Sequence, residues 1–145
     1  MKKGIILSVI IFIFVNLSMS SQELGLRLGD ISGGNVAIDG IFSTGKFSRI
    51  HADASFGNGL GIDALWDFLY RPLGSEAVDW YVGAGPFTYL SDDFFLLGGV
   101  GEIGIEYHFM EIPLAIGADF RPYISLVEET DFTAGFGINI RYVFK

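Results

Sequence analysis

The sequence contains no cysteine, which excludes a disulfide framework, a thiolate metal site and a cysteine-linked lipid anchor. It also lacks any stretch after Leu24 that keeps an apolar period of 3.6 residues, so amphipathic helices are not expected. The formal charge is −8 at pH 7, whereas a nucleic-acid partner calls for a basic patch. What is abundant favours strands and turns: 20 glycines and 15% aromatic residues in a chain of single-domain length.

The first 20 residues are predicted to be a secretory signal peptide. Lys2 and Lys3 form its positive start, residues 5–15 its apolar core, and residues 18–20 the small-x-small pattern that a signal peptidase needs. The apolar run is about a dozen residues, shorter than the ~20 that a membrane-spanning helix requires, so an uncleaved anchor is the less favoured alternative. Residues 21–145 are then expected to form one domain.

Alternation of apolar and polar residues with period two recurs along the rest of the chain and is clearest from Phe132 to Lys145. Each alternating segment is close to the ~9–11 residues of a tilted membrane strand. Pro72 and Gly74 predict a loop, and Pro86, which cannot donate a ladder hydrogen bond, predicts a bulge. The predicted strands are 23–31, 35–43, 47–57, 60–70, 78–89, 95–109, 112–124 and 132–145.

Alternation alone fits two opposite proteins, a soluble lipocalin-like barrel with its apolar face inside and a membrane barrel with that face outside. The interior of an eight-stranded barrel is just wide enough to be filled by side chains. The apolar phase, which includes Trp66, Phe68 and Tyr70, is too bulky for that space. The other phase combines small residues with charges, and all arginines, Arg71 included, are assigned to it or to its continuation at a strand end.

The sequence therefore predicts an all-β fold, an eight-stranded antiparallel up-and-down transmembrane barrel with a polar, side-chain-filled lumen. Charged side chains in that lumen are expected to pair, because arginine and carboxylate groups match in bidentate geometry. Seven acids and five arginines are assigned to this phase. The predicted lumen ion-pair network comprises Arg27, Asp39, Arg49, His51, Asp53, Asp63, Asp67, Glu102, Glu106, Asp119, Arg121 and Arg141.

A cleaved signal, eight alternating strands, a charged lumen and an aromatic-ended last strand together resemble the small outer-membrane barrels of the OmpA/OmpX class. The resemblance implies the bacterial outer membrane, a monomer in contact with membrane lipid and lipopolysaccharide, and both termini in the periplasm. It also implies that the barrel-assembly machinery reads the last strand. The sequence departs from the class in its short connections and in Lys145 after the final aromatic. The predicted assembly signal comprises Phe136, Ile138, Ile140, Tyr142 and Phe144.

The remaining motifs do not predict catalysis or a cofactor. His51, Asp53 and Ser55 share one strand face, but such neighbours stand roughly 7 Å apart, too far for a catalytic triad. The glycines at 99, 101 and 104 match G-x-G-x-x-G within a strand, whereas a dinucleotide site needs a following helix. Acidic connections at 92–93 and 128–131 are expected to be solvated, with cation binding as the alternative. No catalytic, cofactor or metal residue is predicted.

These features predict a structural or interaction role, in envelope integrity or in a surface contact. A narrow channel for ions or small solutes is the first alternative, because the acids outnumber the arginines in the predicted lumen. An enzyme that acts on lipid is a further alternative. A lipocalin-like ligand carrier would follow if the two faces were inverted.

Overall fold

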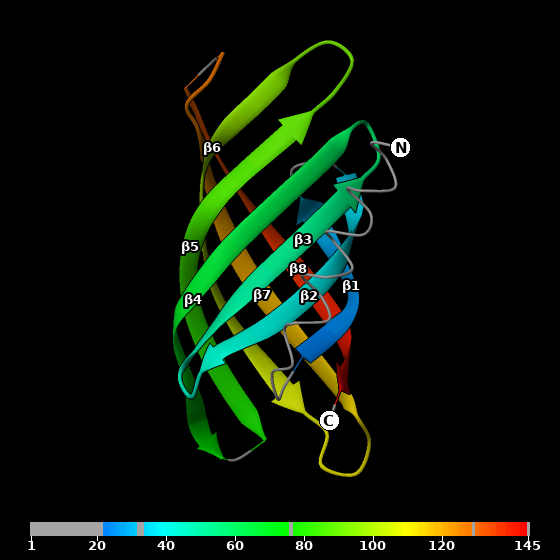
Figure 1. The fold of residues 1–145 in the computed structure, drawn as a ribbon, viewed down its shortest axis with the longest axis vertical. Helices are drawn as coiled ribbons and strands as arrows, with labels where there is room; N and C mark the ends of the chain where they lie inside the picture. The colour runs from blue at the N-terminus through cyan, green and yellow to red at the C-terminus, as the bar shows by residue number, and fades with distance from the viewer. Residues whose placement is uncertain (1–21, 32–33, 76, 129, 145) are drawn as a thin grey trace, which may run out of the picture.

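The computed structural model describes residues 22–31, 34–75, 77–128 and 130–144. It is a closed barrel in which every strand pairs antiparallel with its neighbours in sequence order and the last strand pairs with the first (Figure 1). The predicted signal peptide lies outside the described residues. Within them, no helix is long and apolar enough to cross a membrane. The strands are β1 (Gln22–Ile31), β2 (Gly34–Gly45), β3 (Ser48–Phe56), β4 (Leu60–Ser75), β5 (Val78–Leu90), β6 (Phe95–His108), β7 (Leu114–Ser125) and β8 (Asp131–Phe144).

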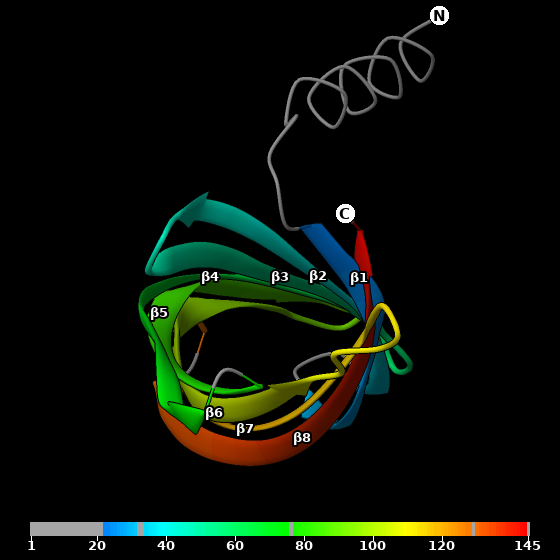
Figure 2. The same cartoon turned by 90° about the horizontal axis from the view of Figure 1, so that it is seen from below.

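All eight predicted strands are present, which confirms the fold class. The barrel has two distinct ends. The start of β1, the end of β8 and the β2–β3, β4–β5 and β6–β7 connections share one end, which we call the terminal end. Figure 2 looks into the barrel from this side. The strand ends that the other four connections join lie at the opposite end.

β4 is longer than predicted, because Pro72 and Gly74 belong to the strand and not to a loop. Pro72 pairs with Asp79 of β5, whereas the described pairing of β4 with β3 ends at Asp67. The last part of β4 therefore has a neighbour on one side only, where a proline without an N–H is tolerated. The predicted loop is wrong for this reason.

The bulge predicted at Pro86 is also wrong. Pro86 pairs with Gly99 of β6, and the β4–β5 register is the same at Asp63 and at Trp66, on either side of the proline. Within the described part of β4, no residue is a ladder partner of Pro86. Pro86 has no N–H to donate, and the missing hydrogen bond leaves only a local gap in the β4–β5 ladder. The strand needs no extra residue there.

The β4–β5 pairing has its register shifts elsewhere, first between Asp67 and Leu69 of β4 and then between Pro72 and Ser75. A bulge reverses the inward and outward phase of the strand beyond it. Tyr70, predicted to face outward, consequently points into the lumen, where its hydroxyl donates a hydrogen bond to Asp79 at 3.0 Å. Arg71, predicted to follow the polar phase, instead lies with its guanidinium 3.7 Å from the centre of the Phe47 ring.

The apolar phase faces outward around the barrel, as the volume argument predicts. On β8, Phe136 and Ile138 are 69% and 61% exposed, whereas Arg141 on the other phase is fully buried. The inverted, lipocalin-like arrangement is therefore not the one that the structure has. One small apolar cluster, formed by Leu65, Phe87, Val100 and Tyr123, does lie inside the barrel.

Candidate functional site: the ion-pair network of the lumen

The structure places all twelve residues of the predicted network inside the barrel. Each of the twelve residues is at most 4% exposed, and together they come from every strand except β5. Alternation along each strand explains this, because a period of two puts every second side chain on the inner face. Burial of so many charges requires that each has a partner.

Arg121 of β7 is the centre of one half of the network. Its Nη1 lies 2.5 Å from Asp53 Oδ2 and 3.3 Å from Asp63 Oδ2. Its Nε and Nη2 reach Glu102 Oε2 at 3.0 and 2.9 Å. One guanidinium thus connects β3, β4 and β6 with β7 across the lumen.

Arg141 of β8 is the centre of the other half. It donates to Glu23 Oε2 at 2.6 Å, to Asp39 Oδ2 at 3.0 Å and, through Nη2, to Glu106. These carboxylates belong to β1, β2 and β6. Arg141 therefore ties the closing strand pair of the barrel, β8 and β1, to the far wall.

Arg49 has both ionic and aromatic partners. It donates to Asp67 at 2.7 Å and to Glu106 at 2.6 Å. The rings of Tyr70 and Tyr81 lie 4.3 and 4.5 Å from its guanidinium carbon, within cation–π range. The Tyr70 contact exists because the β4 bulge turns this side chain inward, so the sequence pattern gave no sign of it.

His51 joins the two halves. Its Nε2 lies 2.5 Å from Asp39, a partner of Arg141, and its Nδ1 lies 2.9 Å from Glu102, a partner of Arg121. Both ring nitrogens therefore face carboxylates, and Ser55 Oγ donates to the carbonyl of Gly61. This geometry differs from a catalytic triad, in which the histidine would accept the serine proton.

Arg27 completes the network near the middle of β1. It is paired with both carboxylate oxygens of Asp119, at 3.1 and 3.2 Å from Nε, and Asn139 Nδ2 donates to the same carboxylate at 3.2 Å. Asp119 also lies 3.6 Å from Arg121 Nε. All four lumen arginines therefore belong to one connected set of ion pairs.

The charge count of the lumen differs from the predicted one. Arg71 is outside, which leaves four buried arginines, and Glu23 is inside, which gives eight buried carboxylates among the residues that the structure describes. Glu23 is on the same phase as Arg27, so strand alternation was the signal that could have found it. The lumen thus has a larger excess of acidic groups than the sequence predicted.

The opposite end of the barrel holds a different feature, a cavity of about 340 Å³. Phe87 and Tyr123, whose rings pack edge to face at 5.1 Å between centroids, line it and also belong to the internal apolar cluster. Tyr123 donates its hydroxyl to Asp63 of the network at 2.8 Å. The apolar cluster therefore lies between the ion pairs and this cavity.

The other sequence motifs are placed as follows. The glycines at 99, 101 and 104 all lie within β6, a continuous strand. The side chains of the predicted assembly signal all lie on the outer face of β8, each at least 47% exposed. Among the described residues, three groups of side chains are spaced closely enough to hold a metal ion, two of them around His51 and one formed by Glu23, Glu106 and His108.

Comparison with known proteins bears on the fold. No protein-family model matches the sequence, and no curated protein matches it. The N-terminal β-barrel domain of Pseudomonas aeruginosa OprF is a similar solved structure, with a TM-score of 0.61 over 86% of this chain and 98% of that chain. The two chains share one fold. They are 14% identical, so the similarity concerns the architecture of the barrel.

Proposed function

We propose that the chain is an integral outer-membrane β-barrel with a structural or interaction role, in envelope integrity or in a surface contact, and without catalysis. One observation carries this proposal: the barrel is apolar on its outside and filled with paired charges on its inside. Water-soluble proteins have the reverse distribution. Lipid is the solvent that such an exterior fits.

The distribution of charge and aromatic residues supports a membrane location. Arginine or lysine on the lipid face costs about 2–4 kcal/mol at the bilayer midplane, which favours the inward placement of Arg27, Arg49, Arg121 and Arg141. Paired aromatic rings lie on the outside near the terminal end, with centroids 5.0 Å apart for Tyr107 and Phe109 and 4.9 Å apart for Tyr142 and Phe144. Such rings are typical of the membrane–water interface.

The connected network favours a closed lumen over a channel. Solute passage would require several buried ion pairs to separate, and breaking one buried pair costs about 3–5 kcal/mol. Closure of the sheet also pairs the described strands on both sides, except at the end of β4, which favours a monomer. Outer-membrane lipid, lipopolysaccharide and, during biogenesis, the barrel-assembly machinery are the partners that we propose.

Heat-modifiability combined with cell fractionation tests the membrane location. Closed membrane barrels stay folded in detergent until heated, so the membrane-extracted protein should have different gel mobilities before and after boiling. A single mobility, with the protein in the soluble periplasmic fraction, would contradict the proposal.

Single-channel recording in planar bilayers then tests the lumen. We expect no steady conductance steps from the folded protein, because Arg121 and Arg141 each bridge three or more carboxylates across the interior. Steps that disappear in the Glu102→Gln or Arg121→Gln variant would favour the channel instead.

A further inference from the structure

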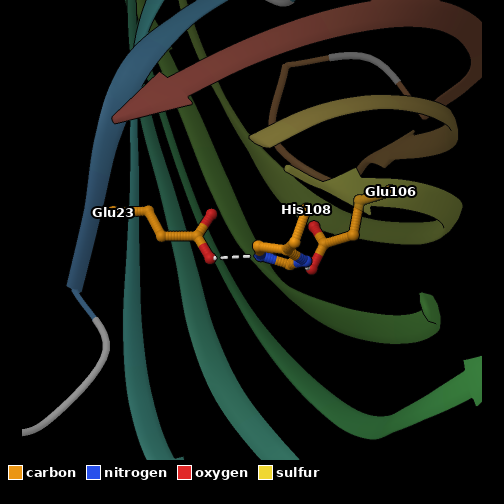
Figure 3. Close-up of side chains that lie close together, drawn as sticks. All are labelled: Glu23, Glu106 and His108. Atoms are coloured by element: carbon orange, nitrogen blue, oxygen red, sulfur yellow. Dashed lines mark hydrogen bonds and ion pairs between the residues drawn. The ribbon is translucent and has the colours of Figure 1, made fainter. Parts of the chain in front are cut away.

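At the terminal end of the barrel, side chains from two strands converge at the mouth of the lumen (Figure 3). Glu23 of β1 and His108 of β6 lie 85 residues apart in the sequence, yet Glu23 Oε1 and His108 Nε2 are 2.9 Å apart. Glu106 Oε1 lies 3.8 Å from the same nitrogen. The ligand atoms of these three residues all lie within 4.8 Å of one another.

The other side of the imidazole is also occupied by a carboxylate. His108 Nδ1 lies 3.4 Å from Asp79 Oδ2, and Tyr70 donates its hydroxyl to that same oxygen at 3.0 Å. Metal-binding histidines commonly donate their second N–H to a carboxylate, which fixes the tautomer and the ring orientation. In this structure Nε2 donates to Glu23; a bound ion would take the place of that Nε2 proton, while Nδ1 keeps its own N–H directed at Asp79.

We propose that Glu23, Glu106 and His108 bind one divalent transition-metal ion at the terminal mouth of the lumen. Imidazole together with carboxylates suits zinc or copper, whereas magnesium and calcium prefer sites made of oxygen alone. Ligand bonds of about 2.0–2.2 Å would bring the three atoms onto one ion after small side-chain movements. Asp79 and Tyr70 act as positioning residues.

Available acceptor lone pairs and access from solvent favour this group over the two around His51. Glu23 gives Oε2 to Arg141 and keeps Oε1 directed at His108, and Glu106 Oε1 retains a second lone pair beside Arg49. The His108 side chain is 23% exposed, so an ion can reach it from solvent. His51 is fully buried and already bridges two carboxylates.

Copper binding to the folded, detergent-solubilised barrel, stripped with a chelator, tests the proposal. We expect one Cu²⁺ per barrel, with an electron paramagnetic resonance spectrum showing coupling to one imidazole nitrogen, and displacement of the copper only by a large excess of Zn²⁺, because Cu²⁺ binds such ligands more tightly. His108→Gln should remove the nitrogen coupling. Asp79→Asn should keep the coupling and weaken binding by about 10–100-fold, as loss of an orienting carboxylate does elsewhere.

Asp93→Asn is the matched control, because this exposed acid lies at the opposite end of the barrel. It should bind copper like the parent. The heat-modifiability gel identifies any variant that fails to fold. For the parent alone, one equivalent of Zn²⁺ should protect His108 from diethyl pyrocarbonate, as mapped by mass spectrometry.

The proposal is overturned if the folded parent binds no copper, if His108→Gln retains the nitrogen coupling, or if Zn²⁺ leaves His108 modification unchanged. These readouts require only a folded barrel, so they are independent of the envelope role proposed above.

Discussion

At the scale of single residues, a buried arginine needs partners for its charge. Each of the four buried guanidiniums contacts at least one carboxylate, and Arg49 is additionally held between two tyrosine rings. Arg71, whose phase the bulge reverses, meets an aromatic ring on the outside instead. The same residue type thus has a different energetic role on each side of the sheet.

Arg141→Leu should strongly destabilise the barrel, because it leaves Glu23, Asp39 and Glu106 buried without their common partner. We expect a loss of about 3–5 kcal/mol in the free energy of unfolding. The matched control is Arg71→Leu, which removes a cation–π contact of about 0.5–1 kcal/mol. Urea titrations in lipid vesicles measure both, and equal losses would contradict the network's role.

At the scale of the strand, the barrel depends on close approach between neighbouring backbones. A Cβ built on Gly25 of β1 would collide with the carbonyl oxygen of Ile140 in β8. β1 and β8 form the pair that closes the barrel. Backbone atoms of a closed sheet cannot move aside without disturbing the ladder, so glycine is required at this position.

Gly25→Ala should therefore destabilise the barrel by about 1–3 kcal/mol or more, the usual cost of overpacking. Gly99→Ala is the control, because a Cβ on Gly99 meets no atom within 4 Å. The comparison of their urea midpoints in vesicles measures the effect. A midpoint for Gly25→Ala equal to that of Gly99→Ala would show that the β1–β8 pairing can relax.

The last strand also carries the predicted assembly signal. Phe144 is the terminal aromatic residue of β8, and Phe132 occupies the same outer face at the other end of the strand. Since the barrels that this chain resembles present their C-terminal aromatics to the assembly machinery, Phe144→Ala should lower the amount of heat-modifiable barrel in the outer membrane. Phe132→Ala should leave it close to the parental amount, and quantitative immunoblots of membrane fractions compare the two. An equal reduction would argue against a terminal signal.

At the scale of the whole molecule, the exterior has to match its solvent. Ile103 of β6 is 52% exposed on the outer face, whereas Val127 is 37% exposed in the connection after β7. If lipid surrounds the barrel, an arginine is costly at the first position and tolerated at the second.

In lipid vesicles, Ile103→Arg should lower the free energy of unfolding by about 2–4 kcal/mol, and Val127→Arg should lower it by about 0–1 kcal/mol. Equilibrium unfolding followed by tryptophan fluorescence measures both, since Trp66 and Trp80 lie in the barrel wall. An Ile103→Arg variant as stable as the parent would mean that this face does not contact hydrocarbon.

The number of strands and, up to the β4 bulge, the inward-facing positions could be predicted from the sequence. Both follow from a local rule, the alternation of side chains along an extended backbone, and all twelve predicted lumen residues obey it. The same rule failed beyond Asp67, where one extra residue in β4 reversed the phase and exchanged the places of Tyr70 and Arg71.

Which charges pair with one another depends on the closed barrel and could not be predicted from the sequence. The contact of Glu23 with His108 and the bridges made by Arg121 and Arg141 join residues far apart in the sequence. Such contacts depend on the stagger and tilt of strands around the closed barrel, which set the height of each side chain along the axis. A local pattern fixes the face of a residue but not its height, so the sequence defined the members of the network and the closed sheet defined its connections.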